Sequence, residues 1–111
     1  MQLGAKQKVF THMIAQLIIW AYDQGYEITV GDAYRDPRVF GPQGYTLGYG
    51  NKNSCHKIRL AMDLNLFKDG EYLTETSDHL PLGEYWEGLG GDWGGRFNDG
   101  NHYSLAHLGN K

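Results

Sequence analysis

The chain has 111 residues, of which 41% are hydrophobic and 21% charged, and its formal net charge at pH 7 is −3. This size and composition predict one globular domain, residues 1–111, with a single core. The negative balance, without any stripe of lysine and arginine, argues against nucleic acid as the main partner. The single cysteine, Cys55, excludes an intramolecular disulfide.

The first segment predicts a core helix over residues 5–24, ended by Gly25. Apolar side chains recur there at four-residue spacing, which is typical of an amphipathic helix. They are Val9, Met13, Leu17 and Ala21, with Phe10, Ile14, Ile18 and Trp20 widening the stripe. A short strand is expected next, over residues 26–30.

The N-terminus lacks the basic and apolar regions of a signal peptide. The apolar run at residues 14–22 is too short and too interrupted to cross a membrane. We therefore expect a protein that is synthesised in the cytoplasm, without a signal peptide or membrane anchor.

Residues 41–53 predict a loop, since four glycines and a proline fall within them. A mobile flap that touches a substrate and a plain surface loop are both compatible with this composition. A glycine-rich phosphate cradle is not, because the segment contains no Gly-Lys-Ser/Thr.

Residues 60–66 alternate between apolar and polar or small side chains, which predicts a strand with one buried face. Its leucines point into the core, and Asp63 and Asn65 lie on the opposite, open face. The step Asp69-Gly70 favours a hairpin that returns through residues 71–73.

The C-terminal third begins with a polar linker, residues 74–79, in which we expect His79 to be solvated. A helix is expected over residues 80–89, ended by two glycines and contributing Trp86 to the core. Trp93 either walls a metal pocket or caps the core. A final short strand is expected at residues 103–106.

A His/Asp/His set emerges from this pattern. His56, Asp63 and His102 offer two nitrogens and one oxygen, which leaves a fourth position open as in a catalytic zinc site. Asp99 lies three residues before His102 and is the candidate base that takes a proton from the attacking water. Spacing alone leaves the ordinary alternative open, in which these histidines are surface or core residues.

Two motifs resemble those of the M15 family of zinc peptidases. Residues 54–63 are similar to its Ser-x-His-x-x-Gly-x-Ala-x-Asp signature, and residues 99–102 match its Glu/Asp-x-x-His motif. Arg59 departs from the family's glycine. The resemblance is nearest to the small phage and prophage members, which share the Trp-Gly-Gly-Arg-Phe-x-Asp-Gly-Asn-His run.

The resemblance implies zinc as cofactor and peptidoglycan stem peptides as substrate. It assigns Arg35 to the oxyanion that forms on the substrate carbonyl, and Ser54 to substrate binding or support of the ligands. Trp93, if it walls the metal pocket, is a further candidate substrate contact. The expected enzyme is a phage-type endolysin that cuts the L-alanyl-D-glutamate bond. A D-Ala-D-Ala carboxypeptidase or dipeptidase is the alternative, and an inactive, zinc-stabilised binding module is a third reading.

The expected fold is α+β, a small domain with an antiparallel sheet, helices packed on one side and the zinc site on the open face. We expect a monomer that is made in the bacterial cytoplasm. Because its substrate would lie outside the membrane, we expect a separate release factor to be needed before it can act on the cell wall.

Overall fold

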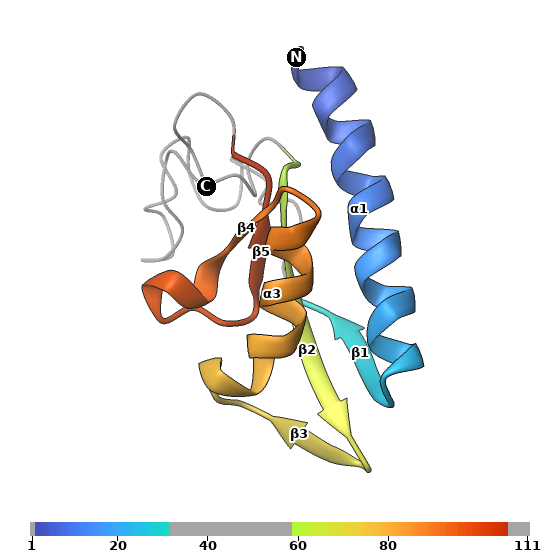
Figure 1. Cartoon of the computed structure of the whole chain (residues 1–111), viewed down its shortest axis with the longest axis vertical. Coiled ribbons are helices and arrows are strands. Elements are labelled where there is room, and N and C mark those ends of the chain that lie inside the picture. The colour runs from blue at the N-terminus through green and yellow to red at the C-terminus, as the bar shows by residue number, and fades with distance from the viewer. Residues whose placement is uncertain (1, 32–58, 107–111) are drawn as a thin grey trace, which may run out of the picture.

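The computed structural model of the chain describes residues 2–31 and 59–106, which form an α+β fold (Figure 1). Its helices are α1 (Leu3–Asp23), η2 (Thr76–His79), α3 (Leu80–Gly88) and η3 (Gly94–Phe97). Its strands are β1 (Tyr26–Val30), β2 (Ala61–Lys68), β3 (Glu71–Leu73), β4 (Asp92–Trp93) and β5 (His102–Ser104). Arg35, Ser54, His56 and the predicted loop 41–53 lie outside the described residues.

All strand pairs among the described residues are antiparallel, and the sheet order is β1-β2-β5-β4. β2 is the central strand. Along one edge it pairs with β1 from Tyr26 to Val30. Along the other edge it pairs first with β5 and then with β3, so its neighbour changes partway along the strand. The predicted fold class, an antiparallel sheet with helices on one side, is confirmed.

The helix α1 follows the predicted stripe closely. Buried residues recur along it at helical spacing, namely Phe10, Met13, Ile14, Leu17 and Ala21. Val9 is an exception, since it is 39% exposed although its neighbour Phe10 is buried against Trp86. Gly25 has φ +92°, a conformation that favours glycine, and this confirms the predicted helix end.

The two α-helices pack on the leucine face of β2. α3 lies between α1 and β4 (Figure 1). Trp86 of α3 is fully buried and makes edge-to-face contacts with Phe10 of α1, at 5.7 Å, and with Tyr103 of β5, at 6.0 Å. Its indole N–H donates to the carbonyl of Ser104 at 2.9 Å. The prediction of a core position for Trp86 is therefore confirmed.

The alternation predicted for β2 is largely confirmed. Leu60, Leu64 and Leu66 are fully buried, while Asp63 and Asn65 are half-buried on the other face. The hairpin to β3 turns at Asp69 and Gly70, with φ values of 52° and 79°. Positive φ at both central residues is the type I′ geometry that an Asp-Gly step favours.

No helix within the described residues combines the length and the apolar character needed to cross a lipid bilayer.

The prediction for residues 74–79 was wrong in one respect. The segment contains the 3₁₀ helix η2, which is closed by a capping box between Glu75 and Asp78. This turn carries His79 inward, where it is 3% exposed and its Nδ1 lies 2.7 Å from the phenolic oxygen of Tyr103. Polar composition predicted a solvated side chain, but the buried phenol gives the imidazole a hydrogen-bond partner.

Burial lowers the pKa of His79, partly opposed by the negative charge of Asp78. The folded state therefore holds His79 neutral, whereas the unfolded chain gains a proton as the pH falls below about 6.5. We expect the melting temperature to fall between pH 7 and pH 5, and to fall less in His79→Gln, which cannot titrate. Thermal unfolding followed by circular dichroism checks this. His12→Gln, at an exposed position of α1, is the control. Equal pH profiles for wild type and His79→Gln would contradict the prediction.

Candidate metal centre and catalytic loop

Two of the three predicted ligands face each other in the sheet. Asp63 of β2 and His102 of β5 are directly paired in the antiparallel register, so their side chains project from the same face. The Oδ1 atom of Asp63 lies 3.4 Å from the Nδ1 atom of His102. Both side chains are mostly buried, at 18% and 14% exposed. The strand β5 begins at His102, one residue earlier than predicted.

This separation fits two ligands of one tetrahedral zinc ion. With Zn–N and Zn–O bonds of about 2.0–2.2 Å and a tetrahedral angle, the two donor atoms of a shared ion lie about 3.4 Å apart. One imidazole nitrogen and one carboxylate oxygen also form a donor pair that zinc accepts. The separation is compatible with the prediction that Asp63 and His102 bind one zinc ion, through Oδ1 and Nδ1.

The third predicted ligand, His56, lies outside the described residues. Across residues 2–31 and 59–106, no group of three or more histidine, cysteine, aspartate or glutamate side chains is arranged to hold a metal ion. The metal site of His56, Asp63 and His102 therefore stays a prediction, and among the described residues only the Asp63–His102 contact bears on it.

The candidate base, Asp99, sits in the turn that leads into His102. Its backbone N–H donates to the carbonyl of Gly94 at 2.9 Å, and its own carbonyl accepts from the N–H of His102 at 3.1 Å. The backbone of Asp99 is thereby fixed at both ends, while its side chain is exposed. Asn98 turns the chain ahead of it in the left-handed conformation, with φ 61°. A fixed backbone with a solvent-accessible carboxylate suits a group that exchanges protons.

Trp93 supports this turn from beneath. It is 4% exposed and belongs to the core, and its indole N–H donates to the carbonyl of Gly100 at 2.7 Å. Its ring lies against Gly83 of α3 and Gly95 of η3, where any Cβ would overlap it. Of the two alternatives weighed for Trp93, the structure shows the core position. Its predicted contact with substrate stays a prediction.

Arg96, next to this tryptophan, is engaged away from the metal centre. Its guanidinium donates twice to Glu87 of α3, at 2.7 and 2.9 Å, and lies 5.2 Å from the Trp93 ring centre. The hydrogen bond from Arg96 lowers the pKa of Glu87. Because this pair is exposed, it contributes little to stability. The pair links η3 to α3.

Glycines around the turn were missed by sequence reasoning as site residues. A Cβ on Gly94 would collide with the carbonyl of Asp99 and come within 2.7 Å of the Cβ of His102. Gly100 donates its N–H to the hydroxyl of Thr76 at 3.2 Å, and a Cβ there would meet the Thr76 backbone. Their position beside Asp99 was the available signal, since a glycine in a functional turn often allows close backbone approach.

Arg59 stands where the M15 signature has glycine, and its φ is 59°. A residue with a side chain is disfavoured by about 1–2 kcal/mol in this left-handed conformation. Glycine, the residue of the M15 signature at this position, adopts positive φ without that cost.

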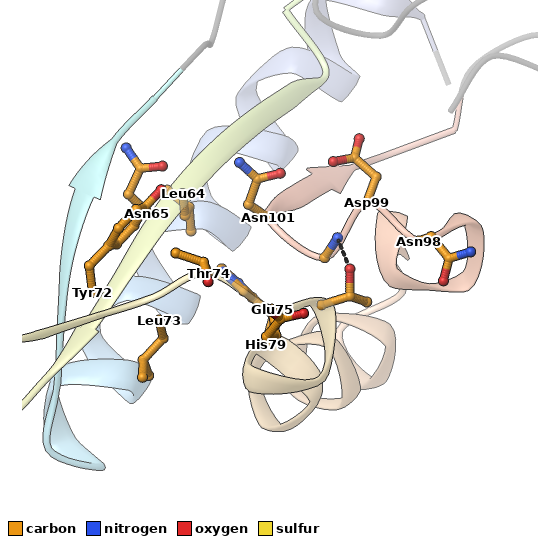
Figure 2. Close-up of a pocket in the computed structure, with 12 residues that line it drawn as sticks. Leu64, Asn65, Tyr72, Leu73, Thr74, Glu75, His79, Asn98, Asp99 and Asn101 are labelled. Atoms are coloured by element: carbon orange, nitrogen blue, oxygen red, sulfur yellow. Dashed lines mark hydrogen bonds between the residues drawn. The ribbon is translucent and has the colours of Figure 1, made fainter.

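A pocket of about 180 Å³ adjoins the turn at residues 98–101, which carries the candidate base Asp99 (Figure 2). It opens where β2 changes its partner from β5 to β3, and the backbone N–H of Leu64 donates to the carbonyl of Asn101 there, at 2.9 Å. Figure 2 shows the side chains of Asn65, Asn101 and Asp99 pointing in the same direction. Asn65 shares its face of β2 with Asp63, so the pocket lies close to the candidate metal centre, although neither Asp63 nor His102 lines it.

Comparison with known proteins decides the family. A peptidase family M15 model, described as D-alanyl-D-alanine carboxypeptidase, matches residues 48–105. The chain belongs to this family. The match spans both motifs, from Ser54 to His102, and so includes all three predicted ligands and the candidate base.

Membership in the M15 D-alanyl-D-alanine carboxypeptidase family supports a peptidase and, in general, one that acts on peptidoglycan. Peptidases of the M15 family generally depend on zinc, which agrees with the donor atoms of Asp63 and His102. No curated protein matches the chain closely enough to report.

The packing around Gly94 makes a testable prediction. In Gly94→Ala, the added methyl group must displace Asp99 or His102, because its nearest neighbours are backbone and Cβ atoms that cannot turn away. We expect peptidase activity to fall at least about tenfold, since small displacements of catalytic groups have large effects on rate. Zinc affinity should fall as well. Activity assays and zinc titration measure the two effects.

Gly88→Ala is the matched control, because nothing lies within 4 Å of a Cβ at Gly88. This variant should keep its activity and be as stable as the wild type or slightly more so. Wild-type activity in a folded Gly94→Ala protein would show that the close approach of Gly94 to Asp99 is not needed.

Proposed function

We propose that this protein is a zinc-dependent peptidase that hydrolyses the stem peptides of bacterial peptidoglycan. The observation that carries the proposal is the 3.4 Å approach of Asp63 Oδ1 to His102 Nδ1, at two ligand positions of the M15 signature. Asp99, the base of the same motif, is linked to His102 by a backbone hydrogen bond. A family match alone would be compatible with a degenerate site, and the short distance between Asp63 and His102 supports a site that still binds zinc.

In this proposal His56, Asp63 and His102 hold the zinc ion. Bound zinc supplies Lewis acidity, which polarises the scissile carbonyl and lowers the pKa of water toward about 7. Asp99 accepts the proton of the attacking water and returns it to the leaving amine. The exposed side chain of Asp99 and its fixed backbone support this shuttle.

Arg35 and Ser54 complete the proposed machinery. We propose, from the M15 resemblance, that the guanidinium of Arg35 stabilises the negative charge that develops on the substrate oxygen. Ser54, in the first motif, would bind substrate through its hydroxyl or steady the ligands. Arg35 lies outside the matched residues 48–105, so its role rests on the resemblance of its Tyr-Arg context alone.

The leading substrate is the L-alanyl-D-glutamate bond, as in phage-type endolysins. The shared Trp-Gly-Gly-Arg-Phe run supports this subtype, and the alternative is D-Ala-D-Ala carboxypeptidase or dipeptidase activity. An inactive, zinc-stabilised binding module is less well supported, because such a module would not need the exposed carboxylate of Asp99 beside the metal.

Substitutions can distinguish the residues that would bind zinc from the residue that would transfer the proton. Asp63→Ala and His102→Ala should each lose the zinc, because each removes a donor atom. Asp99→Asn should keep the zinc and the fold but lose turnover by about 10²–10⁴-fold, since it removes only proton transfer. Elemental analysis and single-turnover assays measure these effects.

Asp69→Asn, at the β2–β3 hairpin, is the matched control, because asparagine tolerates the same positive φ. It should retain both zinc and activity. Full zinc content in His102→Ala would overturn the ligand assignment. More than about a tenth of wild-type activity in Asp99→Asn would place the base elsewhere.

The bond that is cut follows from the products. Purified peptidoglycan should release new N-terminal D-glutamate and C-terminal L-alanine, because the proposed endopeptidase cuts inside the stem peptide. Mass spectrometry of the soluble fragments identifies these termini. Release of free D-alanine without solubilisation of the wall would favour the carboxypeptidase alternative.

The proposed role also requires that the enzyme reach the cell wall. We expect it to act as a monomer, with a separate factor that opens a route across the membrane. Both expectations remain predictions.

A further inference from the structure

The pocket beside Asp99 is not lined by the predicted ligands Asp63 and His102. It is lined by residues that are their neighbours in the sequence. Its wall includes Leu64 and Asn65, which directly follow the ligand Asp63 on β2. It also includes Asn101, which directly precedes the ligand His102 on β5. A substrate whose scissile bond lies at the metal centre would therefore extend a neighbouring group into this pocket.

The size of the pocket fits one side chain. Its volume of about 180 Å³ lies below the range of about 300–1,000 Å³ that is typical of sites for whole small molecules. Asp63 and Asn65 are two residues apart on β2, which corresponds to about 7 Å along a strand. The group that enters would thus belong to a residue within about two positions of the scissile bond.

The chemistry of the wall selects a cation. Two carboxylates, Glu75 and Asp99, line the pocket together with amide and hydroxyl groups, and none of its described lining residues is lysine or arginine. The carboxylate of Glu75 accepts one backbone N–H in the capping box, which leaves further lone pairs free. The amide nitrogen of Asn65 donates to Thr29 at 3.3 Å, which leaves its carbonyl oxygen to accept a hydrogen bond.

We propose that this pocket is a specificity subsite that binds the side-chain ammonium group of a diamino acid in the substrate peptide, with Glu75 as its principal charged contact. Stem peptides of peptidoglycan contain such a residue, so the inference rests on the proposed function and adds the feature that is recognised. An ammonium group has three donors and no acceptor, which matches a wall of carboxylate, amide and hydroxyl oxygens. The half-buried Leu73 gives its methylene chain an apolar contact.

A terminal carboxylate is the competing occupant, because a carboxypeptidase must bind one. The two acids of this wall would repel it, and the described lining offers no cationic side chain to offset the repulsion. The subsite therefore favours an internal, amine-bearing residue over a free C-terminus at this position.

The test compares two synthetic stem peptides that differ only in the side-chain amine of the diamino acid, free in one and acetylated in the other. Acetylation removes the charge with little change in length. We expect the free-amine peptide to have a KM about threefold to tenfold lower at similar kcat. Glu75→Gln should abolish most of this difference while hydrolysing the acetylated peptide normally. Glu27→Gln, an exposed acid on β1, is the matched control and should behave as wild type.

Binding of the same two peptides, followed by NMR shifts of the Thr76, Gly100 and Asn101 amides, provides a second readout that needs no turnover. Tighter binding of the free amine, with shifts at these three amides that are lost in Glu75→Gln, supports the subsite. Equal binding of both peptides to the wild type overturns it, whether or not they are hydrolysed. Failure of hydrolysis alone, with preferential binding retained, would count against the proposed peptidase and not against the subsite.

Discussion

The structure depends on the pairing of β2 with β5. This one antiparallel contact places Asp63 opposite His102 and brings their donor atoms to 3.4 Å. Ordered strands hold such a pair more rigidly than loops can, because the backbone of each residue is fixed by its ladder of hydrogen bonds. The same contact directs Met62 and Tyr103 to the opposite face, so one register decides both the core and the candidate metal centre.

The turn that carries Asp99, residues 98–101, is held by aromatic packing as well as by its own hydrogen bonds. Trp93 fills the space between α3 and η3 and anchors Gly100 with its indole N–H. Trp86 does the same for β5 through the carbonyl of Ser104. Each ring fits because a glycine faces it, Gly83 for Trp93 and Gly91 for Trp86. The many glycines of this small domain thus serve close packing as well as turns, and large rings supply much of the buried area.

His79 of η2 and Tyr103 of β5 form a buried polar layer. His79 and Tyr103 are both buried and lie within hydrogen-bond distance of each other, and burial raises the pKa of Tyr103 far above its usual range. Because burial lowers the pKa of His79 as well, this layer is neutral. A neutral layer next to the strand that carries His102 leaves the charge at the candidate site to its own ligands and to Asp99. His79 also lines the pocket and so joins this layer to the proposed subsite.

The sequence by itself determined the elements and their faces. Four-residue spacing predicted α1, two-residue alternation predicted β2 with Asp63 on its open face, and the Asp-Gly step predicted the hairpin. These signals are local, since each depends only on how neighbouring side chains point along one element. The two motifs likewise identified the family, because their spacing lies in the chain itself.

Only the tertiary structure decided which separate segments meet. Polar spacing cannot show that His79 turns inward to Tyr103, that Gly94 lies under Asp99, or that a pocket opens where β2 changes partners. Val9 likewise fits the four-residue spacing of the helical stripe, and yet the fold leaves it 39% exposed. Contacts of this kind join residues that are distant along the chain. They follow from how helices and strands fill one shared core, which no local pattern encodes.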